Sequence, residues 1–434
     1  MNIRTVTIAL LIFLTIPLLA RAEDWPQWRG PHFNGSSDET GLPDTLNPQE
    51  AAWKTSFPGV GASTPIVSGN RIFVTYQATE TKKLTVVCID RTSGTICWSR
   101  EVSTANASNK MADLSSCSPV ADGKHVIFYF GTGDLACFDF DGNPIWSRNI
   151  PADHGAFNIL WLYASSPLLY QGKLYIEVLQ RDVPINGAPP PTPADSYLLA
   201  IDPQTGKDLW KHVRPSDALV ESREAYTTPI PMDTPQGPEL LIMGGDHLTG
   251  HDPATGREIW RSPTYNPTKI NSWRTVCSAC VADGLVIGCP PKSGTMFAVK
   301  PGEGDVPFAW HSTELKSDVC VPLLYKGKLY VLDGDQRILN CVDPKTGQKL
   351  WSGLLDPKHV VFRASPTGAD GKIYLMNEAG DVWVVSADEF KVLSKASLAS
   401  EAMRRARCRA SITVADGQVF VRTADTVMAF GKGK

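Results

Sequence analysis

The stretch AIDPQTGKDLW, Ala200–Trp210, is one copy of a phrase that recurs along this chain of 434 residues. Close copies end at Trp260 (HDPATGREIW) and Trp351 (VDPKTGQKLW). Looser copies end at Trp98, Trp146 and Trp310. Successive tryptophans are 41 to 64 residues apart, which is the period of a propeller blade rather than of a helical repeat. The repeat therefore predicts the fold class.

Each copy has the pattern of two strands joined by a tight turn. In Ala200–Trp210, the carboxylate of Asp202 suits hydrogen bonding to the turn backbone, and Gly206 supplies the positive φ that closes the hairpin. A small residue opens each unit and an indole closes it, which lets sheet faces interdigitate without voids. We therefore predict that the repeat tryptophans are structural docking residues. They are Trp53, Trp98, Trp146, Trp210, Trp260, Trp310 and Trp351.

A second phrase precedes each hairpin and contains an apolar run near a proline, a short glycine turn and an alternating strand. Clear examples are SSPLLYQGKLYI from Ser165 and CVPLLYKGKLYV from Cys320, and ITVADGQVFV from Ile412 is the eighth. Two strands here and two in the Trp-ended hairpin make a four-stranded antiparallel blade. The sequence thus predicts an all-β protein, an eight-bladed β-propeller of four-stranded antiparallel blades. The seventh copy closes weakly, with VVSADEFKVLSK in place of a Trp-ended strand.

The eighth blade is one strand short when the chain ends at Lys434. The segment AAWKTSF around Trp53 has the pattern of a lone strand. An N-terminal strand that completes the last blade closes the ring and protects its edges. We therefore predict an N-terminal lead-in segment at residues 23–50 and a propeller at residues 51–434.

The first residues have the pattern of a secretory signal peptide. Arg4 gives a positive start, the run from Val6 to Leu19 is apolar, and Ala20-Arg21-Ala22 is an A-x-A cleavage site. We predict a signal peptide at residues 1–22, cleaved after Ala22, and an exported protein that is periplasmic or secreted. The apolar run is short for a membrane span and no later segment approaches one, so no transmembrane span is predicted.

Charge and cysteine content limit the partners. A net charge of −3 gives no reason to expect nucleic acid as a partner. Most of the ten cysteines stand at repeat positions where sister copies have Ala, Ser or Val, which favours buried free thiols. Bridges between Cys88 and Cys97 and between Cys277 and Cys289 remain open alternatives. Cys277 and Cys280 have C-x-x-C spacing without a second such pair, so no metal site is predicted.

The pattern A-x-D-x-x-T-G-K-x-x-W of Ala200–Trp210 resembles the tryptophan-docking repeat of the quinoprotein (PQQ-type) β-propellers. That superfamily includes quinoprotein alcohol dehydrogenases and the outer-membrane assembly propeller BamB. The segment from Asp24, DWPQWRGPHFNGSSDETGLPDTL, is similar to the lead-in of exported bacterial PQQ-repeat-like proteins. The resemblance covers nearly all of residues 24–434 and implies the scaffold, because the docking residues are structural.

The resemblance does not extend to the catalytic and metal-binding residues of the enzymes. Quinoprotein dehydrogenases have a vicinal Cys–Cys bridge, and this sequence contains no adjacent cysteine pair. Their Ca-binding Glu and Asn and their catalytic Asp have no counterpart here that can be matched residue by residue. No catalytic residue is therefore predicted.

Loops that lead into the innermost strands share one face of such a propeller with the loops between second and third strands. On that face, Arg274, Arg363 and Arg409 precede the inner strands of blades five, seven and eight. Guanidinium groups converging beside Trp273 would suit a carboxylate, a sulfated sugar or an acidic peptide. The alternative that these arginines are solvated or paired with neighbours stays open. The candidate ligand-binding residues are Arg223, Trp273, Arg274, Asp318, Arg363, Arg409 and Asp246.

We expect an exported, non-catalytic, monomeric propeller without a cofactor that acts as a protein-interaction scaffold in the bacterial cell envelope. Its partner would be an envelope protein or an acidic small molecule or glycan. Two alternatives stay open. One is an oxidoreductase that uses PQQ with Ca²⁺, and the other is a binder of acidic polysaccharide at the arginine-lined face.

Overall fold

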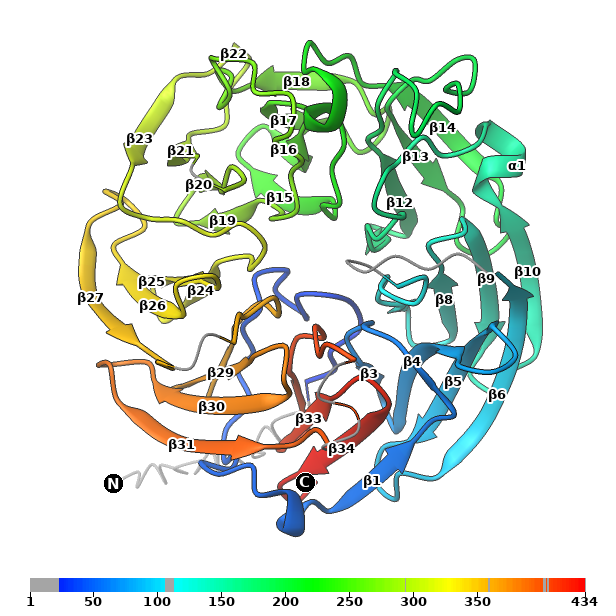
Figure 1. Cartoon of the computed structure of the whole chain (residues 1–434), viewed down its shortest axis with the longest axis vertical. Helices are drawn as coiled ribbons and strands as arrows, with labels where there is room; N and C mark the ends of the chain where they lie inside the picture. Colours follow the sequence, from blue (N-terminus) through cyan, green and yellow to red (C-terminus); the bar gives the residue numbers. More distant parts are fainter. Residues whose placement is uncertain are drawn as a thin grey trace, which may run out of the picture.

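The computed structural model describes residues 23–105, 113–292, 294–357, 360–400, 403 and 406–433. Their strands form eight sheets arranged as blades around a central axis, in chain order (Figure 1). The helices of this part of the chain are short segments, among them η1 (Pro48–Glu50), α1 (Ile150–His154) and η2 (Val220–Arg223). The predicted all-β, eight-bladed propeller is confirmed.

From the inside outwards, the first four blades are as follows. Blade one contains β3 (Ile66–Ser68), β4 (Arg71–Ala78), β5 (Lys83–Asp90) and β6 (Ile96–Thr104), with β2 (Gly59–Val60) beside β4. Blade two contains β7 (Val120–Ala121), β8 (His125–Tyr129), β9 (Asp134–Asp139) and β10 (Pro144–Asn149). Blade three contains β11 (Leu168–Tyr170), β12 (Lys173–Val178), β13 (Tyr197–Ile201) and β14 (Asp208–Val213). Blade four contains β15 (Ile230–Thr234), β16 (Gly237–Gly244), β17 (His247–His251) and β18 (Glu258–Arg261).

The other four blades repeat the plan. Blade five contains β19 (Cys280–Ala282), β20 (Leu285–Gly288), β21 (Met296–Val299) and β23 (Phe308–Ser312). Blade six contains β24 (Leu323–Tyr325), β25 (Lys328–Asp333), β26 (Ile338–Val342) and β27 (Lys349–Leu354). Blade seven contains β28 (Thr367–Ala369), β29 (Lys372–Met376), β30 (Asp381–Ser386) and β31 (Val392–Ser397). Blade eight contains β32 (Thr413–Ala415), β33 (Gln418–Arg422), β34 (Thr426–Phe430) and β1 (Trp53–Ser56).

The ring is closed by a strand from the N-terminal part of the chain. Strand β1 pairs antiparallel with β34, with Trp53 opposite Ala429 and Ser56 opposite Thr426. In Figure 1 this joins a blue strand to a red one in a single sheet. The predicted closure is therefore confirmed.

The repeat tryptophans dock each blade onto the next one. Trp146, in the outer strand of blade two, lies opposite the small Cys137 of its own sheet. Its indole Nε1 donates to the carbonyl oxygen of Pro203 in blade three at 2.9 Å. A Cβ placed on Gly206 of blade three would lie 2.6 Å from the Trp146 ring. The repeat glycine thus provides the space that the indole of the preceding blade fills.

The same indole donation occurs at four other joints. Trp53 donates to Arg91, Trp98 to Phe140, Trp210 to Pro253 and Trp310 to Pro344, over 2.8 to 3.2 Å. At these joints the indole thus donates to the backbone of the next blade.

Three joints depart from the repeat. Between blades six and seven, the buried Nε1 of Trp351 has no hydrogen-bond partner among the described residues. The indole of Trp260 donates to Glu239 within its own blade at 2.6 Å. Here the chain adds β22 (Gly304–Asp305) to blade four as a parallel fifth strand, which the sequence pattern did not predict. In blade seven, as predicted, no tryptophan closes the sheet, and Ser394 stands at that position opposite Val384. The Ser394 hydroxyl donates to the carbonyl oxygen of Asp44 in the lead-in at 2.6 Å.

The lead-in segment, residues 23–50, packs across one face of the ring and passes its centre (Figure 1). It contacts the turns between first and second strands, for example at Gly69, which donates to Asp24 at 2.9 Å, and at Gly417, which donates to Glu39 at 2.9 Å. Successive strands are antiparallel, so these turns lie on the face opposite the loops that lead into the innermost strands. We call the face that carries the loops leading into the innermost strands the mouth face.

Arg29 anchors the lead-in from inside the protein. Its side chain is buried and donates to the carbonyl oxygens of Pro322 at 2.7 Å and Pro366 at 3.0 Å. These carbonyls belong to blades six and seven. Burial lowers the pKa of Arg29 to about 10, which still leaves it charged at neutral pH.

The ten cysteines are free thiols, and of these only Cys97 is exposed. Neither open alternative, Cys88–Cys97 or Cys277–Cys289, is therefore a disulfide. Within the described ranges, no helix has the length and apolar character needed to cross a bilayer. The predicted signal peptide, residues 1–22, lies outside those ranges.

Candidate functional site

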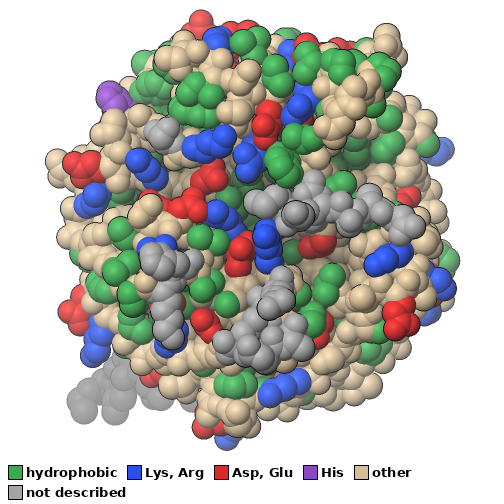
Figure 2. Space-filling model, viewed as in Figure 1, with side chains coloured by type: hydrophobic (Ala, Val, Ile, Leu, Met, Phe, Trp, Pro, Cys, Tyr) green, Lys and Arg blue, Asp and Glu red, His purple; other side chains and the backbone are tan. Residues whose placement is uncertain are grey.

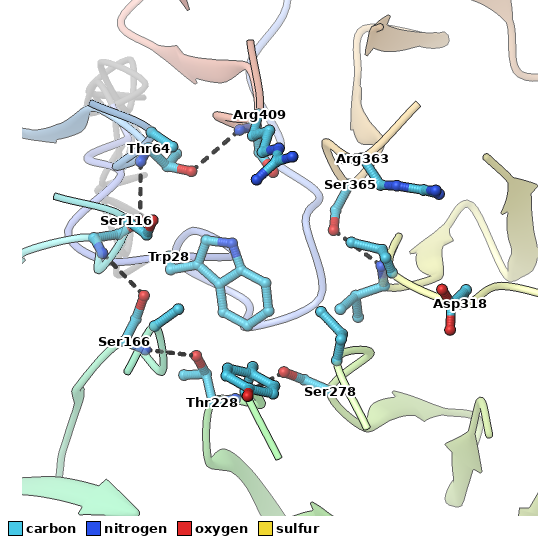
Figure 3. Close-up of a pocket in the computed structure, with 18 of the residues that line it drawn as sticks. Trp28, Thr64, Ser116, Ser166, Thr228, Ser278, Asp318, Arg363, Ser365 and Arg409 are labelled. Carbon is cyan, nitrogen blue, oxygen red and sulfur yellow. Dashed lines mark hydrogen bonds between the residues drawn. The ribbon is translucent and has the colours of Figure 1, made fainter. Parts of the chain in front are cut away.

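A belt of hydroxyl side chains surrounds the channel where each innermost strand begins. The backbone N–H of Thr64 donates to Ser118 Oγ at 3.0 Å, and that of Ser118 to Ser166 Oγ at 2.9 Å. The equivalent hydrogen bond joins blades three and four and blades four and five. It recurs between blades six and seven and between blades eight and one (Figure 3). The members of this hydroxyl belt are Thr64, Ser118, Ser166, Thr228, Ser278, Ser365 and Ser411. In blade six the residue equivalent to these hydroxyl residues is a valine, so the belt lacks a hydroxyl group there.

Trp28 of the lead-in lies at the centre of the hydroxyl belt (Figure 3). It lines a cavity of about 230 Å³ together with belt residues. The neighbouring Arg29 is fixed to two blades, so the lead-in holds this indole across the channel. Trp28 thus lies within the channel, whereas Trp25 is buried in a core cluster with residues of blades one and eight.

One wall of the cavity combines the aromatic rings of Trp161 and Tyr226 with the side chain of Arg274. The indole of Trp161 donates to Glu221 Oε1 at 2.8 Å, and the guanidinium of Arg274 lies 3.7 Å from the same oxygen. The guanidinium carbon of Arg274 is 5.7 Å from the centre of the Trp161 ring, within cation–π range. Glu221 therefore fixes both side chains in one orientation.

Tyr226 continues this wall, and its hydroxyl donates to Glu224 Oε2 at 2.6 Å. Glu224 is fully buried and also bonds Arg181. Burial raises the pKa of Glu224, partly offset by these hydrogen bonds. The aromatic wall is thus supported by buried polar contacts that restrict its movement.

The other two arginines of the cavity are also paired. Arg363 lies 2.6 Å from Asp335, and Nε of Arg409 donates to Glu378 at 2.7 Å. The three arginines of the cavity are therefore paired with neighbouring carboxylates, which was one of the alternatives that the sequence left open. In Figure 2, basic and acidic side chains intermingle around the centre of this face. The mouth presents oriented N–H donors rather than a field of unbalanced positive charge.

The structure brings together four of the seven candidate residues, because Arg274, Asp318, Arg363 and Arg409 all line the cavity. Figure 3 labels Asp318, Arg363 and Arg409 around it. The carboxylate of Asp318 accepts a hydrogen bond from the backbone of Lys292 at 2.9 Å.

The other three candidates do not line the cavity. Arg223 pairs with Asp182 at 3.2 Å, and Trp273 packs against the core between blades four and five. Asp246 is buried and accepts hydrogen bonds from Asn266, and burial raises its pKa to about 6.

The sequence reasoning missed the hydroxyl belt and gave no binding role to Tyr226. A signal for the belt exists, since a hydroxyl residue directly precedes proline at Thr64, Ser118, Ser166, Thr228 and Ser365. Within one repeat, this dipeptide indicates only the start of a strand. Its convergence on the axis follows from ring geometry, which no single repeat displays.

The lining residues do not fit a quinone held with Ca²⁺. Ca²⁺ takes about six to eight oxygen ligands, with carboxylates prominent among them. Among the lining residues that the structure describes, Asp318 supplies the one carboxylate, and three guanidinium groups face the same space. One carboxylate is fewer than a Ca²⁺ site of this kind takes.

The fold and the cavity define a tryptophan-docked propeller whose channel is closed at one end by its own lead-in. A family model described as "Outer membrane protein assembly factor BamB" matches residues 47–183, 82–286 and 194–432. The chain belongs to this family of PQQ-type propellers, and the resemblance seen in the sequence is confirmed. No curated protein sequence matches the chain.

Solved structures similar to this one include both enzymes and an assembly protein. The "Europium-containing methanol dehydrogenase" aligns with a TM-score of 0.67 at 12% identity, covering 94% of this chain and 98% of its own. The quinohemoprotein alcohol dehydrogenase from Comamonas testosteroni aligns with a TM-score of 0.64 at 13% identity, covering 95% and 81%. BamB from Moraxella catarrhalis aligns with a TM-score of 0.59 at 13% identity, covering 88% and 99%. At these identities the likeness shows the shared fold alone.

Proposed function

We propose that this protein is a non-catalytic binding scaffold of the bacterial cell envelope and that its mouth-face cavity receives a side chain of a protein partner. The proposal includes export after cleavage behind Ala22 and a monomeric scaffold. The observation that carries it is the composition of the cavity, which joins Trp28, Trp161 and Tyr226 to Arg274, Arg363 and Arg409. Trp, Tyr and Arg are the residues enriched at binding hot spots of protein interfaces.

The size of the cavity supports a protein partner. Pockets for whole small molecules are typically about 300–1,000 Å³, and this one is about 230 Å³. It suits one large side chain whose backbone remains outside, near the arginines. The family description, an outer membrane protein assembly factor, also supports a protein partner.

Binding is favoured over catalysis by the side chains available. Nucleophilic catalysis by a hydroxyl needs a base within hydrogen-bond reach. The described lining residues include no histidine, cysteine or lysine, and the belt hydroxyls accept backbone hydrogen bonds from the neighbouring blade. The cavity can therefore hold a group firmly without activating it.

Site-specific photocrosslinking in the envelope tests this function. A photoreactive amino acid at Val319, which lines the cavity, should give a discrete protein adduct, while the same group at the exposed Ile145 on β10 should not. The double substitution Arg274→Ala with Arg363→Ala should reduce the adduct at least about tenfold, since a hot-spot residue contributes about 2 kcal/mol or more. Arg257→Ala, on an exposed turn outside the cavity, is the matched control.

The outcomes separate the alternatives. A Val319 adduct that consists of glycan would replace the protein partner by the acidic polysaccharide. Quinone absorbance retained after adding PQQ and Ca²⁺, together with dye reduction by alcohols, would replace binding by oxidoreduction. Equal protein adducts from Val319 and Ile145 would rule out the cavity as the binding site.

A further inference from the structure

Glu23, the residue that follows the predicted cleavage site, is held on the ring by its backbone and its side chain. Its backbone nitrogen donates to Glu39 Oε1 at 2.9 Å. Its own carboxylate accepts from the backbone of Asp38 at 2.9 Å and lies 3.2 Å from His32 Nε2. The position of the nitrogen of residue 23 is therefore fixed by several contacts within the lead-in.

Glu39 connects this nitrogen to the blade that closes the ring. Its side chain is 4% exposed, and its second oxygen accepts from the backbone of Gly417 at 2.9 Å. Gly417 lies in the turn between β32 and β33 of blade eight. One buried carboxylate thus bridges the start of the lead-in and the closing blade.

We infer that removal of residues 1–22 creates an α-ammonium group on Glu23 that forms a buried ion pair with Glu39 and locks the lead-in onto blade eight. The inference rests on the export that the proposed function includes. Hydrolysis of the bond between Ala22 and Glu23 adds one water, leaves a carboxylate on Ala22 and frees the Glu23 amine. At neutral pH this amine binds a proton, because α-amino groups titrate near pH 8.

The chemistry of the contact changes on cleavage while its position stays the same. Before cleavage, a neutral amide N–H donates to the Glu39 carboxylate. After cleavage, the donor is a cation, so the attraction between opposite charges is added to a hydrogen bond that the Glu39 carboxylate already accepts. Burial strengthens the attraction further, since Glu39 is almost inaccessible to water.

The surroundings favour a cation at this place. Glu23, Asp38 and Glu39 contribute carboxylates, and His32 lies between the first two of them. The hydrogen bond with Glu23 raises the pKa of His32, which indicates an acidic environment. An ammonium group at Glu23 would reduce the repulsion among these carboxylates and stabilise the segment that carries Trp28.

The test compares chains that differ at the N-terminus. One begins at Glu23 with a free amine, verified by mass spectrometry, and the other carries Gly-Ser before Glu23, which keeps an amide there. Each is also made with Glu39→Gln. Hydrogen–deuterium exchange is followed at the amides of Trp25 and Gly417, which donate to Val67 and Glu39 respectively.

We expect at least about tenfold slower exchange with the free amine than with Gly-Ser, and loss of that difference in Glu39→Gln. Asp38→Asn, at an exposed carboxylate of the same cluster, should keep the difference. Equal exchange in the two chains, or a difference that survives Glu39→Gln, would overturn the inference.

Two further results would also overturn the inference. Glu23, His32 and Asp38 have ligand atoms within 4.8 Å of one another. A difference abolished by EDTA would mean that a metal ion there, and not the ammonium, stabilises the lead-in. The exported protein must also begin at Glu23, and a different N-terminal residue would contradict the processing step.

Discussion

In this ring the indole of one blade packs against a glycine of the next blade, as Trp146 packs against Gly206. A methyl group on Gly206 would lie 2.6 Å from the indole ring, and its backbone has φ +71°. Substitution at this glycine therefore has two costs, backbone strain and displacement of the indole. A matched glycine elsewhere in the ring separates them.

Gly172 is that match, because it also has φ +71°, and a methyl group added there would meet no atom within 4 Å. We expect Gly172→Ala to cost about 1 kcal/mol through strain alone. Gly206→Ala should cost a further 1–3 kcal/mol or so, since overpacking adds about that amount. Urea unfolding measures both, and equal costs would contradict the docking role of the glycine.

A buried carboxylate between blades three and four makes a pH-dependent contribution to stability. Glu177 is 1% exposed and accepts from the Thr227 hydroxyl through Oε1. Burial raises the pKa of Glu177 to about 8 from the ordinary value of 4.5, against the opposing effect of that hydrogen bond. The folded protein therefore binds a proton that the unfolded chain releases between these two values.

The sign follows from proton linkage. Between pH 4.5 and about 8 the folded state binds more protons at Glu177, so its contribution to the free energy of unfolding falls as pH rises and levels off above about 8. Glu177→Gln, which imitates the protonated form, should remove up to about 1.4 kcal/mol of this loss per pH unit. Urea unfolding at several pH values checks this, with Glu303→Gln on an exposed turn as the control. A constant difference between the Glu177 variant and the native protein would contradict the raised pKa.

The lead-in is an element without regular strands that depends on one buried arginine. Arg29 donates to carbonyl oxygens of blades six and seven, and removing it leaves those buried acceptors without their donor. We expect Arg29→Ala to lower the free energy of unfolding by about 3 kcal/mol or more, because hydrogen bonds to charged groups contribute about 1.5–3 kcal/mol each. Arg29→Lys keeps the charge but not the forked geometry, so it should be intermediate.

Denaturant unfolding and proteolysis of the lead-in measure this effect. An Arg29→Ala protein as stable as the native one would show that Trp28 and its neighbours hold the lead-in without the arginine.

The elements that the sequence predicted are those whose signals are local. Each Trp-ended hairpin carries its own turn residues, and the lone strand at Trp53 followed from a missing partner at the other end. Strand β22 was not predicted because a two-residue parallel pairing leaves no periodic pattern. The loop face was predictable, but the direction of each side chain was not. Asp246, for example, stands at φ +68° and points to buried Asn266 rather than to the channel.

The whole molecule depends on a closure that joins residues separated by almost the full chain. Thr55 and Val427 are partners in one sheet, so opening the ring at blade eight between these distant segments requires separating β1 from β34. A chain that begins at residue 57 would lack both β1 and the lead-in. The outer side of β34 would then present unpaired backbone groups, which are a template for pairing with another chain.

We expect such a chain to form dimers or larger species in size-exclusion chromatography with light scattering, whereas the chain beginning at Glu23 should remain monomeric. A synthetic peptide spanning residues 23–57 should restore the monomer, because it supplies the strand with the register seen here, Trp53 opposite Ala429. The same peptide with Trp53→Ala should restore it less well, since it loses the indole contact to Arg91 and Gly94. A monomeric chain without the peptide would mean that blade eight is complete with three strands, and that the ring is held by contacts between neighbouring blades rather than by β1.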